Sequence, residues 1–172
     1  MRKFVLLAIF VLVAVPATFA QSSTSPTVQA SLLCKQQRTA FGPLAFKLLY
    51  GGGSNAFGRC VSKLSSTVQN NNANAAKQCK AERDDAAFAD THDGKTFAQF
   101  YGTGAHGNNA FGKCVSSKAK AQQDAQQQAT INAAKQCKTE RTTLGPAEFT
   151  KKYGGRSNAF GKCVSKAVHA NP

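Results

Sequence analysis

The chain has 172 residues and a formal net charge of +14, from 22 lysine and arginine residues against 8 aspartate and glutamate residues. A positive charge of this size attracts anionic polymers and surfaces. The three histidines do not occupy matching positions in the internal repeat of the chain, which argues against a repeated Cys–His zinc site.

Residues 1–20 are typical of a secretory signal peptide. Arg2 and Lys3 precede an apolar run at 4–15, Pro16 ends the run, and small residues allow cleavage after Ala20. The run is shorter than the ~20 residues that a membrane span needs, so a signal peptide is favoured over an anchor. No other segment is apolar enough to cross a membrane. We therefore expect a secreted protein, extracellular or in the cell envelope, with a mature net charge of +12.

Two short phrases recur three times along the mature chain. Lys-Gln-Cys-Lys-x-Glu-Arg stands at 77–83 and 135–141, with a diverged copy at 33–38. Each copy is followed by Asn-Ala-Phe-Gly-(Arg/Lys)-Cys-Val-Ser, at 55–62, 109–116 and 158–165. The repeat predicts three tandem modules: module 1 at 30–66, module 2 at 75–118 and module 3 at 133–169. Residues 21–29 are predicted to be a disordered lead.

All six cysteines lie in these phrases, one in each. Export to an oxidising compartment makes an even number of cysteines a disulfide framework. Pairing within each module treats the three copies alike and predicts the bonds Cys34–Cys60, Cys79–Cys114 and Cys137–Cys163. No Cys-x-x-Cys pair is present, so structural disulfides are favoured over a zinc site or a redox-active dithiol.

Module 3 shows the helical pattern most clearly. Residues 132–143 carry apolar positions three and four apart, which indicates a helix. Gly145-Pro146 ends that helix and begins a second, which Gly154 ends. A third helix follows Ser157 or Asn158. The pattern predicts an all-α fold with two or three short helices in each module and a disulfide that joins the first helix to the last.

The copies differ in the connections between these elements. The two cysteines of modules 1 and 3 are 26 residues apart, whereas those of module 2 are 35 apart, and the additional residues are expected in surface connections. The linker at 119–132 is either a continuation of the flanking helices or a flexible Gln-rich segment. The junction at 65–72 contains poorer helix formers and is expected to be loose.

Two further positions recur in every module. Gly58, Gly112 and Gly161 lie inside a helical pattern, which suggests close approach of the first helix of the module. Arg38, Arg83 and Arg141 follow the first cysteine by four residues. We expect each arginine to be half-buried with a polar partner, or alternatively to grip a ligand.

The phrases Cys-Lys-x-Glu-Arg, Phe-x-x-x-Tyr-Gly and Asn-Ala-Phe-Gly-Lys-Cys-Val-Ser, in this order, resemble a repeat of uncharacterised secreted bacterial proteins. The resemblance covers the three modules. It implies secretion and a helical repeat, and it brings no reaction, ligand or site. This chain departs from the pattern at Gln37, where the other copies have Glu82 and Glu140, and in the enlarged module 2.

The densest cluster of ionisable groups lies in module 2: Asp84, Asp85, Asp90, His92 and Asp93. Its spacing does not match an EF-hand loop, and no glutamate closes the loop. A solvated insertion is the favoured interpretation, and neither a metal nor another cofactor is predicted. The alternative is a small secreted hydrolase or metal-dependent enzyme that uses these acids.

The positive charge is concentrated in modules 1 and 3, which carry +5 and +6, whereas module 2 carries +1. This distribution predicts a non-catalytic protein that binds anionic extracellular polymers or surfaces, although the charge could simply maintain solubility. Sequence-specific nucleic-acid recognition is not expected, because no such motif is present. The predicted polyanion-binding residues are Lys35, Arg38, Lys47, Arg59, Lys63, Lys135, Lys138, Lys151, Lys152, Arg156, Lys162 and Lys166.

Overall fold

The computed structural model describes residues 25–170 except Gly52, Ala105 and residues 156–157. The predicted signal peptide and residues 21–24 of the predicted lead lie outside this part of the chain. The described part is all-α, as predicted, and contains no strand. Its elements are α1 (Pro26–Phe41), α2 (Pro43–Tyr50), α3 (Ala56–Asp84), the 3-10 helix η1 (Phe88–Thr91), α4 (Phe97–Tyr101), α5 (Ala110–Tyr153) and α6 (Ala159–Ala170).

The first helix begins earlier than the sequence suggested. Ser25 caps α1 by accepting a hydrogen bond from the Val28 backbone amide at 3.4 Å, and Pro26 occupies the first turn, where its fixed φ suits a helix. The prediction of a disordered lead is therefore wrong for residues 26–29. Gly42, with φ of 80°, ends α1, and Pro43 begins α2 directly after it.

Both junctions between modules are helical. The junction at 65–72 is part of α3, so the prediction of a loose connection is wrong. Its low helix propensity is offset by packing, because Val68, Asn71 and Ala75 are buried. The side-chain amides of Asn71 and Gln126 exchange two hydrogen bonds, of 3.0 and 3.3 Å, between α3 and α5. Residues 119–132 lie within α5, so of the two alternatives the continuous helix is confirmed.

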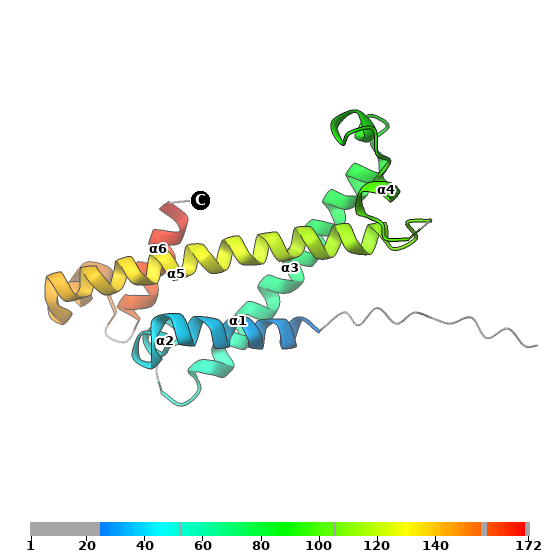
Figure 1. Ribbon diagram of the computed structural model, residues 1–172. Helices are drawn as coiled ribbons and strands as arrows, with labels where there is room; N and C mark the ends of the chain where they lie inside the picture. Colours follow the sequence, from blue (N-terminus) through cyan, green and yellow to red (C-terminus); the bar gives the residue numbers. More distant parts are fainter. Residues whose placement is uncertain (1–24, 52, 105, 156–157, 171–172) are drawn as a thin grey trace, which may run out of the picture.

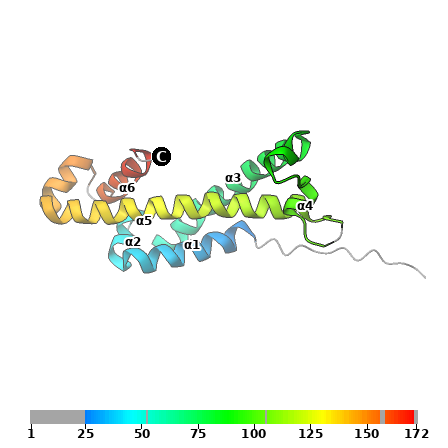
Figure 2. The same ribbon diagram turned by 45° about the horizontal axis from the view of Figure 1, so that its top comes forward.

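Helices α3 and α5 each end one module and begin the next, and they cross near the middle of the molecule (Figure 1). Helices α2 and α6 lie near one end of α5, and module 2, with η1 and α4, lies at the other end in both views (Figures 1 and 2). Gly145, with φ of 76°, kinks α5 between its two module 3 segments. Among the described residues, no helix has the length and apolar character that a membrane span requires.

Modules 1 and 3 share a single hydrophobic core, and we call this pair the main lobe. The shared core includes Cys34, Phe46, Cys137, Phe149 and Phe160, all buried. The two modules are in direct contact where α2 packs on α6. The modules at the two ends of the repeat array therefore form one body, although the whole of module 2 lies between them in sequence.

Module 2 has a separate core of its own. Phe88, supplied by the insertion as part of η1, is buried together with Phe97 and Ala110 around the Cys79–Cys114 disulfide. The Phe88 ring lies 5.6 Å from that of Phe97 and stacks on the imidazole of His92 at 3.7 Å. The insertion is thus part of the core of module 2 as well as a surface connection.

Two of the three recurring glycines, Gly58 and Gly161, have a different role from the one expected. A Cβ atom at Gly58 or Gly161 would meet the side-chain oxygen of the asparagine three residues earlier, at 2.6 Å from Asn55 and 2.8 Å from Asn158. At Gly161 it would also lie 3.2 Å from the Leu49 carbonyl oxygen. These glycines make room for the asparagine at the start of the helix and, in module 3, for α2 of module 1. They do not make room for the first helix of their own module.

Candidate functional site

All three disulfides join cysteines of the same module, as the repeat predicted. The Cα atoms are 6.0 Å apart in Cys34–Cys60, 5.9 Å in Cys79–Cys114 and 6.0 Å in Cys137–Cys163. Each bond connects the first helix of its module to the last. The six sulfur-bearing side chains are almost fully buried, which fits a structural role.

A polar pair lies beside each disulfide, and the sequence patterns alone did not identify it as a site. The Tyr101 hydroxyl donates to Glu82 at 2.9 Å, and the Tyr153 hydroxyl donates to Glu140 at 2.8 Å. In module 1 the Tyr50 hydroxyl donates to Gln37. The signal was present in the sequence, because each module keeps a Glu or Gln three residues after its first cysteine and a tyrosine in the Phe-x-x-x-Tyr-Gly phrase. Gln37 stands out in the sequence as a departure, but nothing there connects this position to the tyrosine.

Lysines neutralise the two glutamates of these pairs. Lys118 lies 2.7 Å from Glu82, and Lys152 lies 2.6 Å from Glu140. Partial burial opposes ionisation of Glu82, but hydrogen bonds from Lys118 and Tyr101 outweigh it and hold the pKa of this carboxyl below its usual value. The hydrogen bond from Lys152 likewise lowers the pKa of Glu140. Both carboxyls are therefore ionised and charge-paired near neutral pH.

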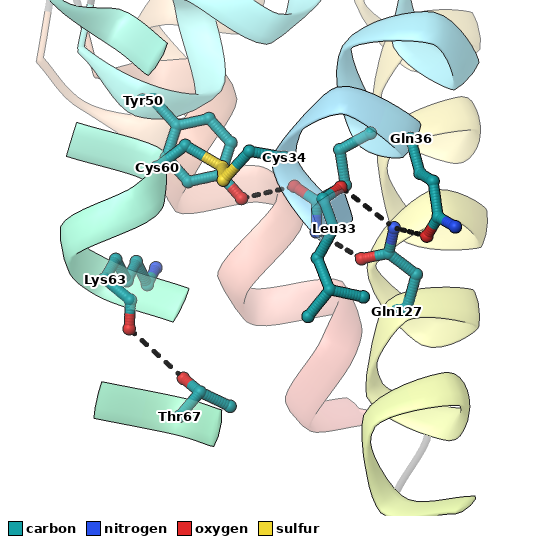
Figure 3. The surroundings of a disulfide bond; sticks show 9 residues. Leu33, Cys34, Gln36, Tyr50, Cys60, Lys63, Thr67 and Gln127 are labelled. Carbon is teal, nitrogen blue, oxygen red and sulfur yellow. Dashed lines mark hydrogen bonds between the residues drawn. A yellow bond between two sulfur atoms is a disulfide. The ribbon is translucent and has the colours of Figure 1, made fainter. Parts of the chain in front are cut away.

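Module 1 has an uncharged version of the same pair, formed by Gln37 of α1 and Tyr50 of α2, and α5 contacts it through Gln127. Gln37 is 1% exposed and donates to the Gln127 side-chain oxygen at 2.7 Å, while Gln127 donates to the Leu33 carbonyl at 3.2 Å. Figure 3 shows Tyr50 beside the Cys34–Cys60 bond and Gln127 approaching from the neighbouring helix. Burial raises the pKa of Tyr50 to about 12. A glutamine suits this position, because a buried carboxylate without a cation is costly.

The recurring arginines are not the half-buried residues that the spacing suggested. Arg38 and Arg83 are exposed, and Arg141 alone is partly buried. Arg83 lies over the Phe111 ring at 5.3 Å and pairs with Asp84 at 3.2 Å. The prediction is therefore wrong for two of the three modules. One helical position earlier, Gln37, Glu82 and Glu140 point toward the tyrosine instead, which leaves the arginines on the outer side of the helix.

The predicted polyanion-binding residues lie on the surface of the main lobe. Arg156 is outside the described residues, and the other eleven are exposed. Lys152 is paired with Glu140, Lys151 approaches Glu148 at 4.0 Å, and Arg59 donates to the Gly51 carbonyl. The other eight make no ion pair with a described residue. They are Lys35, Arg38, Lys47, Lys63, Lys135, Lys138, Lys162 and Lys166.

The fold brings the positive charges of modules 1 and 3, which are far apart in sequence, into one body. Module 1 contributes +5 and module 3 contributes +6, and the shared core joins them in one lobe of net charge +11. Module 2, with a net charge of +1, lies at the far end of α5 (Figure 2). The molecule therefore has one strongly basic end and one nearly neutral end.

The acids of module 2 do not converge on one site within the described residues. Asp84 pairs with Lys80 at 2.5 Å and with Arg83, and the Asp85 carboxylate accepts from the Ala87 backbone amide at 2.9 Å. His92 stacks on Phe88 and contacts its carbonyl oxygen at 2.8 Å. No group of three or more His, Cys, Asp or Glu side chains in the described chain could hold a metal ion. Asp85 alone among these acids lines the groove of about 460 Å³ in this module.

Comparisons of the chain with family models, curated proteins and solved structures found no match.

Proposed function

We propose that the protein is secreted and acts without catalysis, binding anionic extracellular polymers or surfaces through the main lobe. The observation that carries this proposal is the union of modules 1 and 3 in one body. Two basic modules held apart would each present a moderate positive field. Joined through a shared core, they present +11 on one lobe, and a field of that size concentrates polyanions at its surface.

The neutral end of the molecule supports the same proposal. In module 2, three of the six cations, Lys80, Arg83 and Lys118, are paired with carboxylates, whereas eight of the predicted cations in the main lobe make no ion pair with a described residue. Unpaired surface lysines and arginines remain available to a ligand. A polyanion should therefore bind at one end of the molecule and leave the other end free.

Retention on immobilised heparin, measured with two triple variants, tests whether polyanions bind at the main lobe and not at module 2. The first variant replaces Lys35, Lys63 and Lys162 with glutamine, and the second replaces Lys77, Lys95 and Lys113. All six side chains are exposed, and both variants lose three charges. We expect the main-lobe variant to elute at clearly lower salt and the module 2 variant to elute close to the unmodified protein.

Binding to random-sequence duplex DNA gives the same comparison in solution. For the main-lobe variant the slope of log K against log salt should become shallower by up to about 2.7, since each counterion released from B-DNA contributes about 0.9. Equal changes in the two variants would show that total charge alone governs binding and would contradict a site on the main lobe. Elution of the unmodified protein below physiological salt would contradict the proposal as a whole.

A further inference from the structure

A groove of about 540 Å³ lies where module 1 meets module 3, at the edge of the shared core. This volume is within the range typical of small-molecule sites, roughly 300–1,000 Å³. Its lining is mainly apolar, and among the lining residues there is no acid. The apolar side chains of the lining are Phe41, Pro43, Leu44, Ala45, Leu48, Pro146 and Phe160.

The apolar lining is not a requirement of the repeat. Leu44, Ala45 and Leu48 of α2 correspond in module 3 to Ala147, Glu148 and Lys151, which occupy the same places after the Gly-Pro pair. Module 3 folds with polar side chains at two of these positions. Leu44 is nevertheless 67% exposed, the largest exposed fraction among the large hydrophobic residues described. Leu44 continues the apolar lining formed by Ala45 and Leu48, and a contiguous apolar surface of this kind is typical of a binding groove.

Two cations lie on the module 3 side of the same groove. Lys138 and Arg141 come from α5 and, among the described residues, neither side chain has an ion-pair or hydrogen-bond partner. Arg141 is partly buried, so its charge faces less solvent than an ordinary surface charge and binds an anion more strongly. The groove thus combines an apolar floor with a positive edge.

We propose that this groove binds a single-chain anionic amphiphile of the alkyl carboxylate class. The carboxylate binds Lys138 and Arg141, and the alkyl chain covers Leu44 and Leu48 and extends toward Phe160. The two cations require an anionic head group, and an alkyl chain is needed to cover the exposed Leu44. This inference goes beyond polymer binding, because a polyanion without an alkyl chain leaves Leu44 exposed.

Calorimetric titration with hexanoate, octanoate and decanoate, each below its critical micelle concentration, tests the proposal. We expect one molecule to bind per chain, with affinity rising between about twofold and fourfold for each added methylene; fourfold corresponds to full burial of the group. Decyltrimethylammonium and an uncharged decyl glucoside have alkyl chains one methylene longer, and they should nevertheless bind at least tenfold more weakly than decanoate.

Two matched pairs of variants locate the site. Leu44→Ser should lower the affinity for decanoate at least threefold, whereas Leu32→Ser, at a leucine of α1 that is 52% exposed and outside the groove, should not change it. Lys138→Gln should lower the affinity more than Lys166→Gln, which removes the same charge elsewhere on the main lobe. All four side chains are exposed, so the fold tolerates each change.

Three results would overturn the groove as the site. These are equal effects of Leu44→Ser and Leu32→Ser, equal affinity for the cationic amphiphile, and binding that begins only once micelles form. Heparin retention separates this proposal from the previous one. Leu44→Ser should leave heparin retention unchanged, and the variant of Lys35, Lys63 and Lys162 should keep most of its affinity for decanoate. Failure of either proposal can thus be recognised without the other.

Discussion

The main lobe and module 2 are built from the same repeat, but they complete their hydrophobic cores in different ways. Modules 1 and 3 cover each other, so that Phe160 is only 4% exposed. The corresponding residue of module 2, Phe111, has no partner module and is 37% exposed, with Arg83 lying over its ring. The comparison shows that the aromatic residue at this position stays partly exposed when no second module covers it.

The insertion supplies what a partner module would otherwise provide. Phe88 enters the core of module 2 and contacts the rings of Phe97, Phe100 and Tyr101 at 5.6, 5.8 and 6.2 Å. His92 covers the other face of Phe88 by stacking. The longer spacing in module 2 therefore has a structural reason, and its acidic residues lie around an internal cap. A repeat can thus be completed by a second copy or by a few residues added in a connection.

Removal of one disulfide at a time is expected to give the largest difference in stability between module 2 and the main lobe. In the chain-entropy model a loop of 35 residues contributes about 4 kcal/mol of stability and one of 26 residues nearly as much. Without Cys79–Cys114, module 2 has only its small core, and η1 and α4 should unfold locally. Without Cys34–Cys60, α1 and α2 should stay folded against module 3.

Hydrogen exchange of the Cys79→Ala/Cys114→Ala and Cys34→Ala/Cys60→Ala variants measures this difference. Loss of protection in α4 is expected for the first variant, while amides of α1 are expected to remain protected in the second. If both variants lost protection to the same extent within their modules, the shared core would not be the support that we describe.

Replacement of Phe88 with alanine is expected to destabilise module 2 by about 3 kcal/mol, at the lower end of the usual cost for a buried phenylalanine. Phe88 is 4% exposed, and the control, Phe100→Ala, removes a ring that is 44% exposed. Urea unfolding followed by amide exchange should show a large effect of Phe88→Ala on α4 and none on α6. Equal effects of the two variants would mean that Phe88 is not the cap of this core.

The substitution Gln37→Glu introduces the residue that the other two modules have at this position. It should lower the free energy of unfolding by about 2 kcal/mol at pH 7. It places a carboxylate where the side chain is 1% exposed and removes the donor to Gln127, which leaves two buried oxygens facing each other. Below pH 4 the protonated glutamate can donate again, so the cost should shrink.

The control for that substitution is Glu82→Gln, whose side chain is 30% exposed. It should cost no more than about 1 kcal/mol, as expected for a partly exposed pair. Chemical unfolding at pH 7 and pH 4 distinguishes the two variants. A cost of Gln37→Glu that does not fall with pH would indicate a steric effect in place of a buried charge.

The smallest expected effect is a response to acid that differs between modules. The pKa values of Glu82 and Glu140 are lowered in the folded protein. The stabilisation that they contribute is therefore present above the unfolded-state pKa of about 4.3 and is lost as the pH falls through the lower folded value. The Gln37–Tyr50 pair of module 1 does not titrate in this range.

A double variant, Glu82→Gln/Glu140→Gln, should for this reason lose less stability than the unmodified protein between pH 6 and pH 3. Asp84, whose pKa is also lowered, through hydrogen bonds from Lys80 and Arg83, is common to both proteins and cancels in the comparison. An unchanged pH dependence would show that the two glutamates are not linked to folding.

The local features of the fold could be predicted from the sequence, whereas the contacts between distant segments could not. The helices and all three disulfides follow from periodicity and from one cysteine in each phrase. The union of modules 1 and 3 depends on surfaces far apart in the chain. The helical junction at 65–72 was missed for the same reason, since Asn71 is a poor helix former that gains its partner, Gln126, only in the folded protein.

The candidate site was predicted in part. The cations of modules 1 and 3 were identified by charge counting, but that they form one lobe required the fold. The apolar groove was not predicted, because Leu44 and Leu48 fit the pattern of an ordinary helix. The fold shows that α2 lines a groove, and the polar Glu148 and Lys151 of module 3 show that its apolar residues are unusual for the repeat. The pair of Glu140 and Tyr153 was not predicted, because the two residues are 13 positions apart in sequence and meet only in the folded module.

The continuous helix α5 between modules 2 and 3 also limits where the chain can accept inserted residues. One residue added to α5 between Gln126 and Ala133 would turn the part of the helix before it by about 100° relative to the part after it and lengthen the helix by about 1.5 Å. Helix α3 would not turn with it, so Asn71 and Gln126 would separate. Insertions are thus tolerated at the tip of module 2 but not along its two connecting helices, where helical phase keeps the basic end and the neutral end in a constant orientation.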